Sequence, residues 1–383
     1  MTDQHFDVIV IGGGVVGSAA AWKLSAAGAR VALVEKNDLC AGASATNPGF
    51  CVLSYRENPL VMELALRQQS EWDPLVAEIG DIEYRPTGGL IPITDDKQLG
   101  VLEGLCQGAS AMGLKDIGII TPDEAAELEP MLDKRQIIAA CWCPGEGKLN
   151  PFRLNLAMAD RAAALGTTIL THTEATGFDI ADGTIRAVET SKGRLEADLI
   201  VLCPGAWTRD IGALAGLDLP IFYERGEAMV SMPVRPTIQR IITDGSLFVQ
   251  ELTDEHPMTI GCCMGQTVSG NIVLAQSTSR PGNYDKSNTF AGMHGVAKRA
   301  VTLFPALRDL TIIRMWSGLV SFAADHMPVF GSCASLGNLF IANSFHSAIA
   351  LAPSIGQLVA DYWKSGSIPE AAKGYSPDRF LKT

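Results

Sequence analysis

The feature that most constrains this chain is an apolar run broken by regularly spaced glycines, DVIVIGGGVVGSAAAWKL at residues 7–24. Residues 6–11 are apolar and β-rich, and Gly12, Gly14 and Gly17 follow with the spacing GxGxxG. Residues 15–27 have a helical composition, and residues 31–34 form a second apolar run that ends on Glu35. The order strand, glycine turn, helix, strand and acid predicts a Rossmann-type dinucleotide site.

Each part of this pattern has a physical reason. The first glycine permits the tight turn, the second lets the backbone approach a pyrophosphate, and the third lets the helix pack on the strand. The start of the helix offers unpaired N–H groups and a positive dipole end to the phosphates. The residues expected at this contact are Gly12, Gly14, Val15, Val16 and Gly17. Glu35 is expected to accept hydrogen bonds from ribose hydroxyls, and an acid at this position disfavours the 2′-phosphate of NADP.

The chain carries one such fingerprint. Other glycine-rich stretches, GCCMGQTVSG and GSCASLGNLF, lack the spacing, so a single dinucleotide is expected and no NAD(P)H site. The small, polar stretch CAGASATNPGF follows the acid closely and is suited to lie along an extended cofactor.

Size and composition narrow the function classes. The 383 residues are 47% hydrophobic and 19% charged, which predicts a packed globular protein of one large or two interleaved domains. The net charge of −12 argues against nucleic acid and anionic lipid as partners. The nine cysteines lack the spacing of a metal cage, so no metal is expected. With no signal peptide and no apolar stretch long enough to span a membrane, the predicted location is cytoplasmic.

An ordered set of segments resembles the D-amino-acid oxidase family of FAD-dependent oxidoreductases. The set includes GASATNPG, GKLNPFRLNLAMADRAAALG, ADLIVLCPGAWT, ERGEAM, RMWSGLVSFAADHMPVFG and NLFIANSFHSAIALAPSIGQLVADYW. Within that family the chain looks most like the FAD-bearing β subunits of opine, hydroxyproline and hydrogen-cyanide-forming dehydrogenases. The resemblance implies FAD as cofactor, and a noncovalent attachment is predicted because residues 313–324 contain no cysteine.

The resemblance also implies an α/β fold with two interleaved domains. We expect residues 1–80, 146–220 and 318–383 to form the Rossmann-type FAD-binding domain. Residues 81–145 and 221–317 are expected to form an antiparallel-sheet α+β substrate domain. Alternating patterns such as LFVQELT and NIVLAQSTS, both in the second domain, are typical of half-exposed strands.

The family's cofactor contacts can be carried over to matching positions. Lys36 joins Glu35 at the adenosine end, Ser44 and Asn47 lie by the pyrophosphate or the flavin, and Gly205 and Trp207 lie beneath the cofactor. Backbone N–H groups near the last helix are expected to face the flavin pyrimidine ring. The remaining residues of this predicted set are Ala175, Gly318, Phe345, His346, Ser347 and Ala348.

The substrate end is less defined. Amino-acid oxidases of the family often carry an arginine in the pattern G-L-R-P that binds the substrate carboxylate, whereas this chain has Val320 at that place. Arg56 is the first candidate to replace it, with Tyr55 beside it and His346 as a further catalytic candidate. Arg85, Arg225 and Arg314 are alternatives, of which Arg225 is better suited to support the domain junction, and His256 is expected to be solvated.

These features predict an FAD-dependent dehydrogenase that oxidises the C–N bond of an amino acid or secondary amine of the opine, sarcosine or proline-derivative type. It would work as the catalytic β subunit of a hetero-oligomer whose partners include an iron–sulfur protein. Two alternatives stay open. One is a stand-alone glycine, sarcosine or D-amino-acid oxidase that forms hydrogen peroxide, and the other is a noncatalytic FAD-binding subunit.

Overall fold

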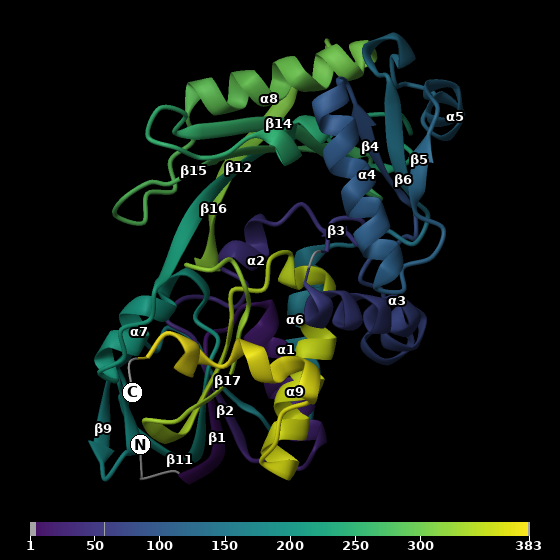
Figure 1. Cartoon of the computed structure of the whole chain (residues 1–383). Helices are drawn as coiled ribbons and strands as arrows, with labels where there is room; N and C mark the ends of the chain where they lie inside the picture. Colours follow the sequence, from purple (N-terminus) through teal and green to yellow (C-terminus); the bar gives the residue numbers. More distant parts are fainter. Residues whose placement is uncertain (1–4, 57, 382–383) are drawn as a thin grey trace.

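The computed structural model describes residues 5–56 and 58–381 and contains two large mixed sheets. The first sheet has the order β17-β18-β11-β1-β2-β8 and occupies the lower half of Figure 1. Its central strands are parallel, as the glycine fingerprint predicts. The members are β1 (His5–Ile11), β2 (Val31–Val34), β8 (Thr168–Leu170), β11 (Gly193–Leu202), β17 (Val329–Cys333) and β18 (Leu336–Asn343). A hairpin of β9 (Ala175–Ala181) and β10 (Thr184–Thr190) extends β11.

Helices pack on this sheet through small residues. Helix α1 (Val15–Ala26) contacts α6 (Pro151–Ala164) and α9 (Ala352–Ser365). A Cβ on Gly356 would lie 2.5 Å from the carbonyl oxygen of Ala19, so α9 approaches α1 as closely as it does because this residue has no side chain. Helix α3 (Pro59–Ile79) contacts both α6 and α9. The helix expected near residues 15–27 is thereby confirmed.

The second sheet has the order β16-β12-β15-β14-β13-β4-β6-β5 and lies in the upper half of Figure 1, beneath α8 (Phe290–Leu303). All neighbouring pairs are antiparallel except β13 with β4. The strands are β4 (Gly89–Ile93), β5 (Gly118–Ile120), β6 (Ala139–Cys143), β12 (Ile221–Pro233), β13 (Ile241–Thr243), β14 (Met258–Gln266), β15 (Asn271–Ser279) and β16 (Ile312–Ala323). Helices α4 (Asp96–Ala111) and α5 (Pro122–Leu128) flank its far end.

One predicted strand is wrong. The stretch LFVQELT at residues 247–253 is not a strand: the 3-10 helix η3 (Gly245–Val249) holds its first three residues, and an irregular segment follows. The Gln250 side chain takes the place of a strand partner, because its amide donates to the carbonyl oxygen of Ile260 and its oxygen accepts the Ile260 N–H, both at 2.9 Å. By contrast, NIVLAQSTS forms β15 as expected.

The remaining elements are short. Helix α2 (Ala43–Thr46), helix α7 (Thr208–Leu214) and the two-stranded sheet of β3 (Phe50–Cys51) and β7 (Gly147–Lys148) lie between the large sheets or at their edges. The other 3-10 turns are η1 (Lys134–Gln136), η2 (Gly205–Trp207), η4 (Pro305–Leu307), η5 (Ala348–Ala350), η6 (Glu370–Tyr375) and η7 (Pro377–Arg379). Among the described residues, no helix is long and apolar enough to span a membrane. The domain boundaries and the cytoplasmic location stay predictions.

Candidate active site

A cavity of about 1120 Å³ runs from the glycine turn of the first sheet to the face of the second sheet. Its wall holds almost every residue expected at the cofactor. From that set it includes Gly12, Gly14, Val15, Val16, Glu35, Lys36, Ser44, Asn47, Ala175, Gly205, Trp207, Gly318, Phe345, His346, Ser347 and Ala348. The exception is Gly17, which lies behind the turn, where a Cβ would stand 1.8 Å from the carbonyl oxygen of Gly12.

The glycine turn presents backbone rather than side chains to the cavity. Gly12 has φ +111°, and a Cβ there would lie 2.5 Å from the carbonyl oxygen of Cys203, so this position requires glycine. Gly14 is the N-cap of α1 and has no side chain to cover the helix end. The Ser44 hydroxyl accepts the Val15 N–H at 2.9 Å, which ties α2 to the start of α1. The turn is therefore a cradle that an added methyl group would obstruct.

Glu35 stands at the end of β2 and orders the turn. One carboxylate oxygen accepts the Gly13 N–H at 2.7 Å and the other accepts the Asn37 N–H at 2.8 Å. Next to it, the Lys36 ammonium lies 3.8 Å from the ring centroid of Trp207, and burial lowers the pKa of this lysine. The Trp207 ring also stacks on Tyr284. It is therefore packed between Lys36, which follows β2 of the first sheet, and Tyr284, which follows β15 of the second sheet.

A loop of the chain from Asn343 to Ala348 forms the far wall. Ser344 and Ser347 both have left-handed backbone conformations, with φ +58° and +54°. Among the described residues, the N–H groups of Phe345, His346 and Ser347 have no acceptor, whereas the Ala348 N–H donates to Phe345. Successive unpaired N–H groups in such a loop form a concave donor site for an electron-rich group. The Asn343 side chain holds the loop by accepting from Ser321 at 2.7 Å and donating to Gly205 at 3.2 Å.

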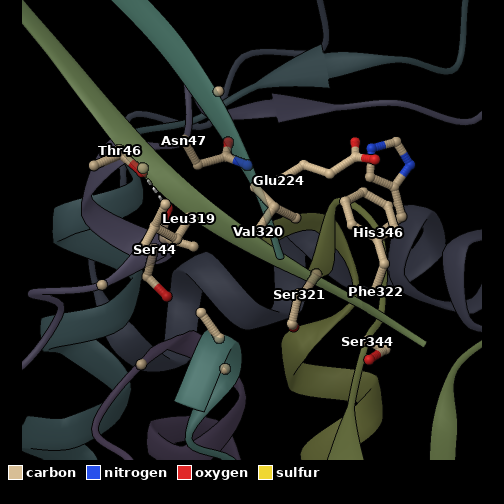
Figure 2. A pocket seen from close by; sticks show the side chains of 18 of the residues that line it. Ser44, Thr46, Asn47, Glu224, Leu319, Val320, Ser321, Phe322, Ser344 and His346 are labelled. Atoms are coloured by element: carbon tan, nitrogen blue, oxygen red, sulfur yellow. Dashed lines mark hydrogen bonds between the residues drawn. The ribbon is translucent and has the colours of Figure 1, made fainter. Parts of the chain in front are cut away.

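His346 is neutral in this environment. Desolvation by the surrounding protein, followed by the charges of Arg56 and His326, lowers the pKa of His346 to about 4, although its side chain is exposed to the open cavity. The imidazole lies on the cavity wall against Phe322, with ring centroids 5.7 Å apart, and Figure 2 shows the two side chains together. Tyr55 also lines the cavity and packs edge-on against Phe248, and burial raises the pKa of its phenol.

Arg56 is close to this loop but is not part of the cavity wall. It is 4% exposed, and its guanidinium donates to the carbonyl oxygens of Val52 at 3.0 Å and His346 at 2.8 Å. The other expected arginines, together with His256, are also absent from the wall. Arg85 is near Asp81, Arg225 is buried and paired with Asp285 at 2.8 Å, and Arg314 is exposed on β16.

The substrate end of the cavity has a different arginine, which sequence reasoning missed. Val320 of β16 is paired with Glu224 of β12 in the antiparallel register. The neighbouring β12 residue, Arg225, is paired with Ser279 of β15, so Arg280 follows across from Glu224. The Arg280 guanidinium lies 2.9 Å from the Glu224 carboxylate. Valine, glutamate and arginine thus form one row across three strands, and Figure 2 shows the first two side by side.

This row supplies the cation of this part of the cavity wall, which also holds the carboxylates of Glu227 and Glu251. Within the described chain, Lys36 and Arg280 are the lysine and arginine side chains of the cavity wall, and Lys36 belongs to the glycine-turn end. Other residues that line this part of the cavity include Phe50, Val52, Leu247, Phe248, Leu252, Gln250, Gln276 and Thr278. In the sequence, Arg280 follows directly after the alternating stretch NIVLAQSTS, which could have marked it as a candidate. Its partner Glu224 could not be identified without the register between β12 and β15.

The residues present fit FAD. A long cavity begins at a side-chain-free turn on a helix end, passes an acid suited to a ribose, and ends at a loop with three unpaired N–H groups. Gly318 adds to the fit, because a Cβ there would lie 1.7 Å from the Thr46 hydroxyl and push α2 away from β16. Figure 2 shows Ser44, Thr46 and Asn47 in the left part of the view and Ser344 and His346 in the right part, near opposite ends of the segment of β16 that is drawn.

Comparisons with known proteins agree with this geometry. A family model described as FAD dependent oxidoreductase matches residues 7–362. The chain is 30% identical over 369 residues to a glycine oxidase of Geobacillus kaustophilus, covering 94% of this chain and 93% of that one. It is 26% identical to a 4-methylaminobutanoate oxidase (formaldehyde-forming) of Paenarthrobacter nicotinovorans, covering 95% of this chain and 44% of that one. The crystal structure of an L-proline dehydrogenase from P. horikoshii superposes with a TM-score of 0.88 at 27% identity, covering 99% and 98% of the two chains.

Proposed function

Because this chain belongs to the D-amino-acid oxidase family of FAD-dependent oxidoreductases, we propose that it oxidises the C–N bond of an N-substituted amino acid. The substrate class is a secondary amine of the opine, sarcosine or proline-derivative type. Bound FAD supplies the hydride acceptor, and the amine becomes an imine that water hydrolyses. The protein residues bind and orient the substrate, exclude water and set the charge around the reacting carbon.

The observation that carries the substrate class is the position of Arg280. The site where the family resemblance places a carboxylate-binding arginine holds Val320, and the cation lies two strands away, on the other side of Glu224. A carboxylate bound by Arg280 is displaced from the wall at Val320, which favours the opine type within this class, because the N-substituent of an opine carries a second carboxylate farther from the oxidised carbon. The Arg280 side chain is 49% exposed and has donors to spare beyond its contact with Glu224.

The wall next to the loop suits an amine. His346 is neutral because its pKa is lowered to about 4, so it does not repel a substrate ammonium. The Glu224 carboxylate is 13% exposed in its side chain and lies on the cavity wall, where it favours a positive group near the substrate end. A zwitterion with a carboxylate and a secondary amine matches both charges.

We propose further that the chain is the catalytic subunit of a dehydrogenase and passes electrons to an iron–sulfur partner. The support is its resemblance to the β subunits of opine-type dehydrogenases and its similarity to a structure named L-proline dehydrogenase. A stand-alone oxidase that forms hydrogen peroxide is the second candidate, favoured by the similarity to glycine oxidase along 94% of the chain.

An anaerobic experiment tests both the proposed substrate class and the proposed electron acceptor. The purified flavoprotein is mixed with glycine, sarcosine, proline derivatives and opines, and the visible absorbance of the flavin is followed. We expect rapid bleaching by an N-substituted amino acid and slower bleaching by glycine. Glycine as the fastest substrate would contradict the proposed class. Admitting oxygen afterwards separates the acceptors: slow reoxidation with little peroxide supports the dehydrogenase, and fast stoichiometric peroxide supports the oxidase.

A further inference from the structure

The buried Arg56 has no contact with the cavity, yet it contacts the loop that forms the cavity wall. Residues 52–56 form a tight turn in which the Arg56 N–H donates to Leu53 and the Nε–H donates to Val52. The buried Glu146 carboxylate fixes the same turn by accepting the N–H groups of Leu53 at 2.8 Å and Ser54 at 2.7 Å. The guanidinium is thereby held in one place behind residues 343–348.

Its contact with His346 determines the direction of one peptide group. Nη1 of Arg56 donates to the carbonyl oxygen of His346 at 2.8 Å. In a planar trans peptide the carbonyl and the following N–H point in opposite directions. The carbonyl of His346 points toward Arg56, so the N–H of Ser347 points away from it. Ser347 lines the cavity and Arg56 does not, so that N–H is directed into the cavity.

The loop needs such a support. Ser344 and Ser347 have left-handed conformations that cost energy for residues with a side chain, and the N–H of Ser347 has no acceptor among the described residues. A cation behind the carbonyl also polarises the peptide and strengthens its N–H as a donor. Arg56 and the His346 peptide group thus direct an N–H donor and a positive potential at a group bound in the cavity next to Ser347.

We propose that Arg56 is a positioning residue that acts through the His346 carbonyl to aim the Ser347 N–H at the flavin and to favour the electron-rich, reduced cofactor. This inference rests on FAD binding and is independent of the substrate class. It replaces our expectation that Arg56 binds the substrate carboxylate, because Arg56 is not part of the cavity wall. The two roles can be told apart because they predict different measurements.

The test uses the FAD-loaded protein and the variants Arg56→Met and Arg56→Lys. Two measurements report on the cofactor without turnover: the two-electron midpoint potential, and the dissociation constant of sulfite, which adds to the flavin and leaves it negatively charged. We expect Arg56→Met to weaken sulfite binding about tenfold. A tenfold loss of relative affinity for the reduced flavin corresponds to a potential lower by about 30 mV. Arg56→Lys, which keeps the charge, should show a smaller change.

Arg225→Met is the matched control, since Arg225 is a similarly buried arginine that does not line the cavity. Its potential and sulfite affinity should stay at the wild-type values. An unchanged potential in Arg56→Met with FAD bound would overturn the proposal. If Arg56→Met does not retain FAD, the neutral variant Arg56→Gln decides, and a wild-type potential and sulfite affinity in that variant would equally overturn the proposal. A raised KM with an unchanged potential would return Arg56 to a role in substrate binding.

Discussion

Glu224 and Arg280 form an ion pair of 2.9 Å on the substrate side of the cavity, directly beside Val320. The pair joins two strands of the second sheet and gives the substrate end its guanidinium. The separation of Arg280 from Val320 follows from strand register, because each step from one strand to the next moves a side chain by one strand spacing, about 4.8 Å.

Replacing Arg280 should weaken substrate binding. Arg280→Gln removes the cation that we assign to the substrate carboxylate, and the KM is expected to rise about tenfold or more while FAD stays bound. Steady-state kinetics together with the flavin spectrum measure both. Arg314→Gln is the control, since Arg314 is exposed on β16 and absent from the cavity wall. Equal KM values for the two variants would remove Arg280 from the site.

Introducing an arginine at position 320 should shift the substrate preference. In Val320→Arg the new guanidinium lies opposite Glu224 and competes with Arg280 for that carboxylate. A carboxylate-binding cation nearer to β16 favours a carboxylate close to the oxidised carbon, so the ratio of kcat/KM for glycine over an opine is expected to rise. Competition between the two substrates in one assay measures this ratio. A ratio that falls or stays constant would show that Val320 does not control substrate length.

The pH dependence of the enzyme should lack the ionisation of His346. Its pKa is lowered from 6.5 to about 4, so the imidazole is neutral throughout pH 5.5–8, and His346→Gln should leave the shape of the kcat/KM profile unchanged in that range. Because the unfolded chain binds the extra proton between pH 4 and 6.5, this group lowers stability as the pH falls through that window and has no effect above it. Urea unfolding at pH 5 and pH 7 should show a smaller difference for His346→Gln. A profile inflection near pH 6.5 that disappears in the variant would contradict the assignment.

The glycine turn should tolerate no side chain at position 17. In Gly17→Ala the methyl carbon would lie 1.8 Å from the Gly12 carbonyl oxygen, so β1 and α1 must separate. We expect a loss of about 1–3 kcal/mol in the free energy of unfolding and weaker FAD binding. Gly104→Ala is the control, because Gly104 lies on α4 with open space around it and alanine favours helices. Thermal unfolding and titration with FAD report the two effects, and wild-type FAD affinity in Gly17→Ala would refute the packing argument.

The cofactor half could be predicted because its information is local. The glycine turn, the first helix and Glu35 all lie within residues 12–35, and their geometry follows from backbone sterics and helix ends. The expected strands at residues 6–11 and 31–34 and the helix at residues 15–27 were also correct, because their patterns are local. The stretch LFVQELT was misread because its alternation matches a strand, while the Gln250 side chain supplies the hydrogen bonds that a neighbouring strand would give.

The sequence by itself determined the strand–turn–helix that receives a dinucleotide and the family that uses it. Only the tertiary structure showed where each arginine lies and what it contacts. Arg56 donates to the backbone of a residue 290 positions away, and Arg280 meets Glu224 through the register of two strands. Contacts of this kind depend on how distant segments pack and which way each side chain points, and neither is encoded in the spacing of residues along the chain.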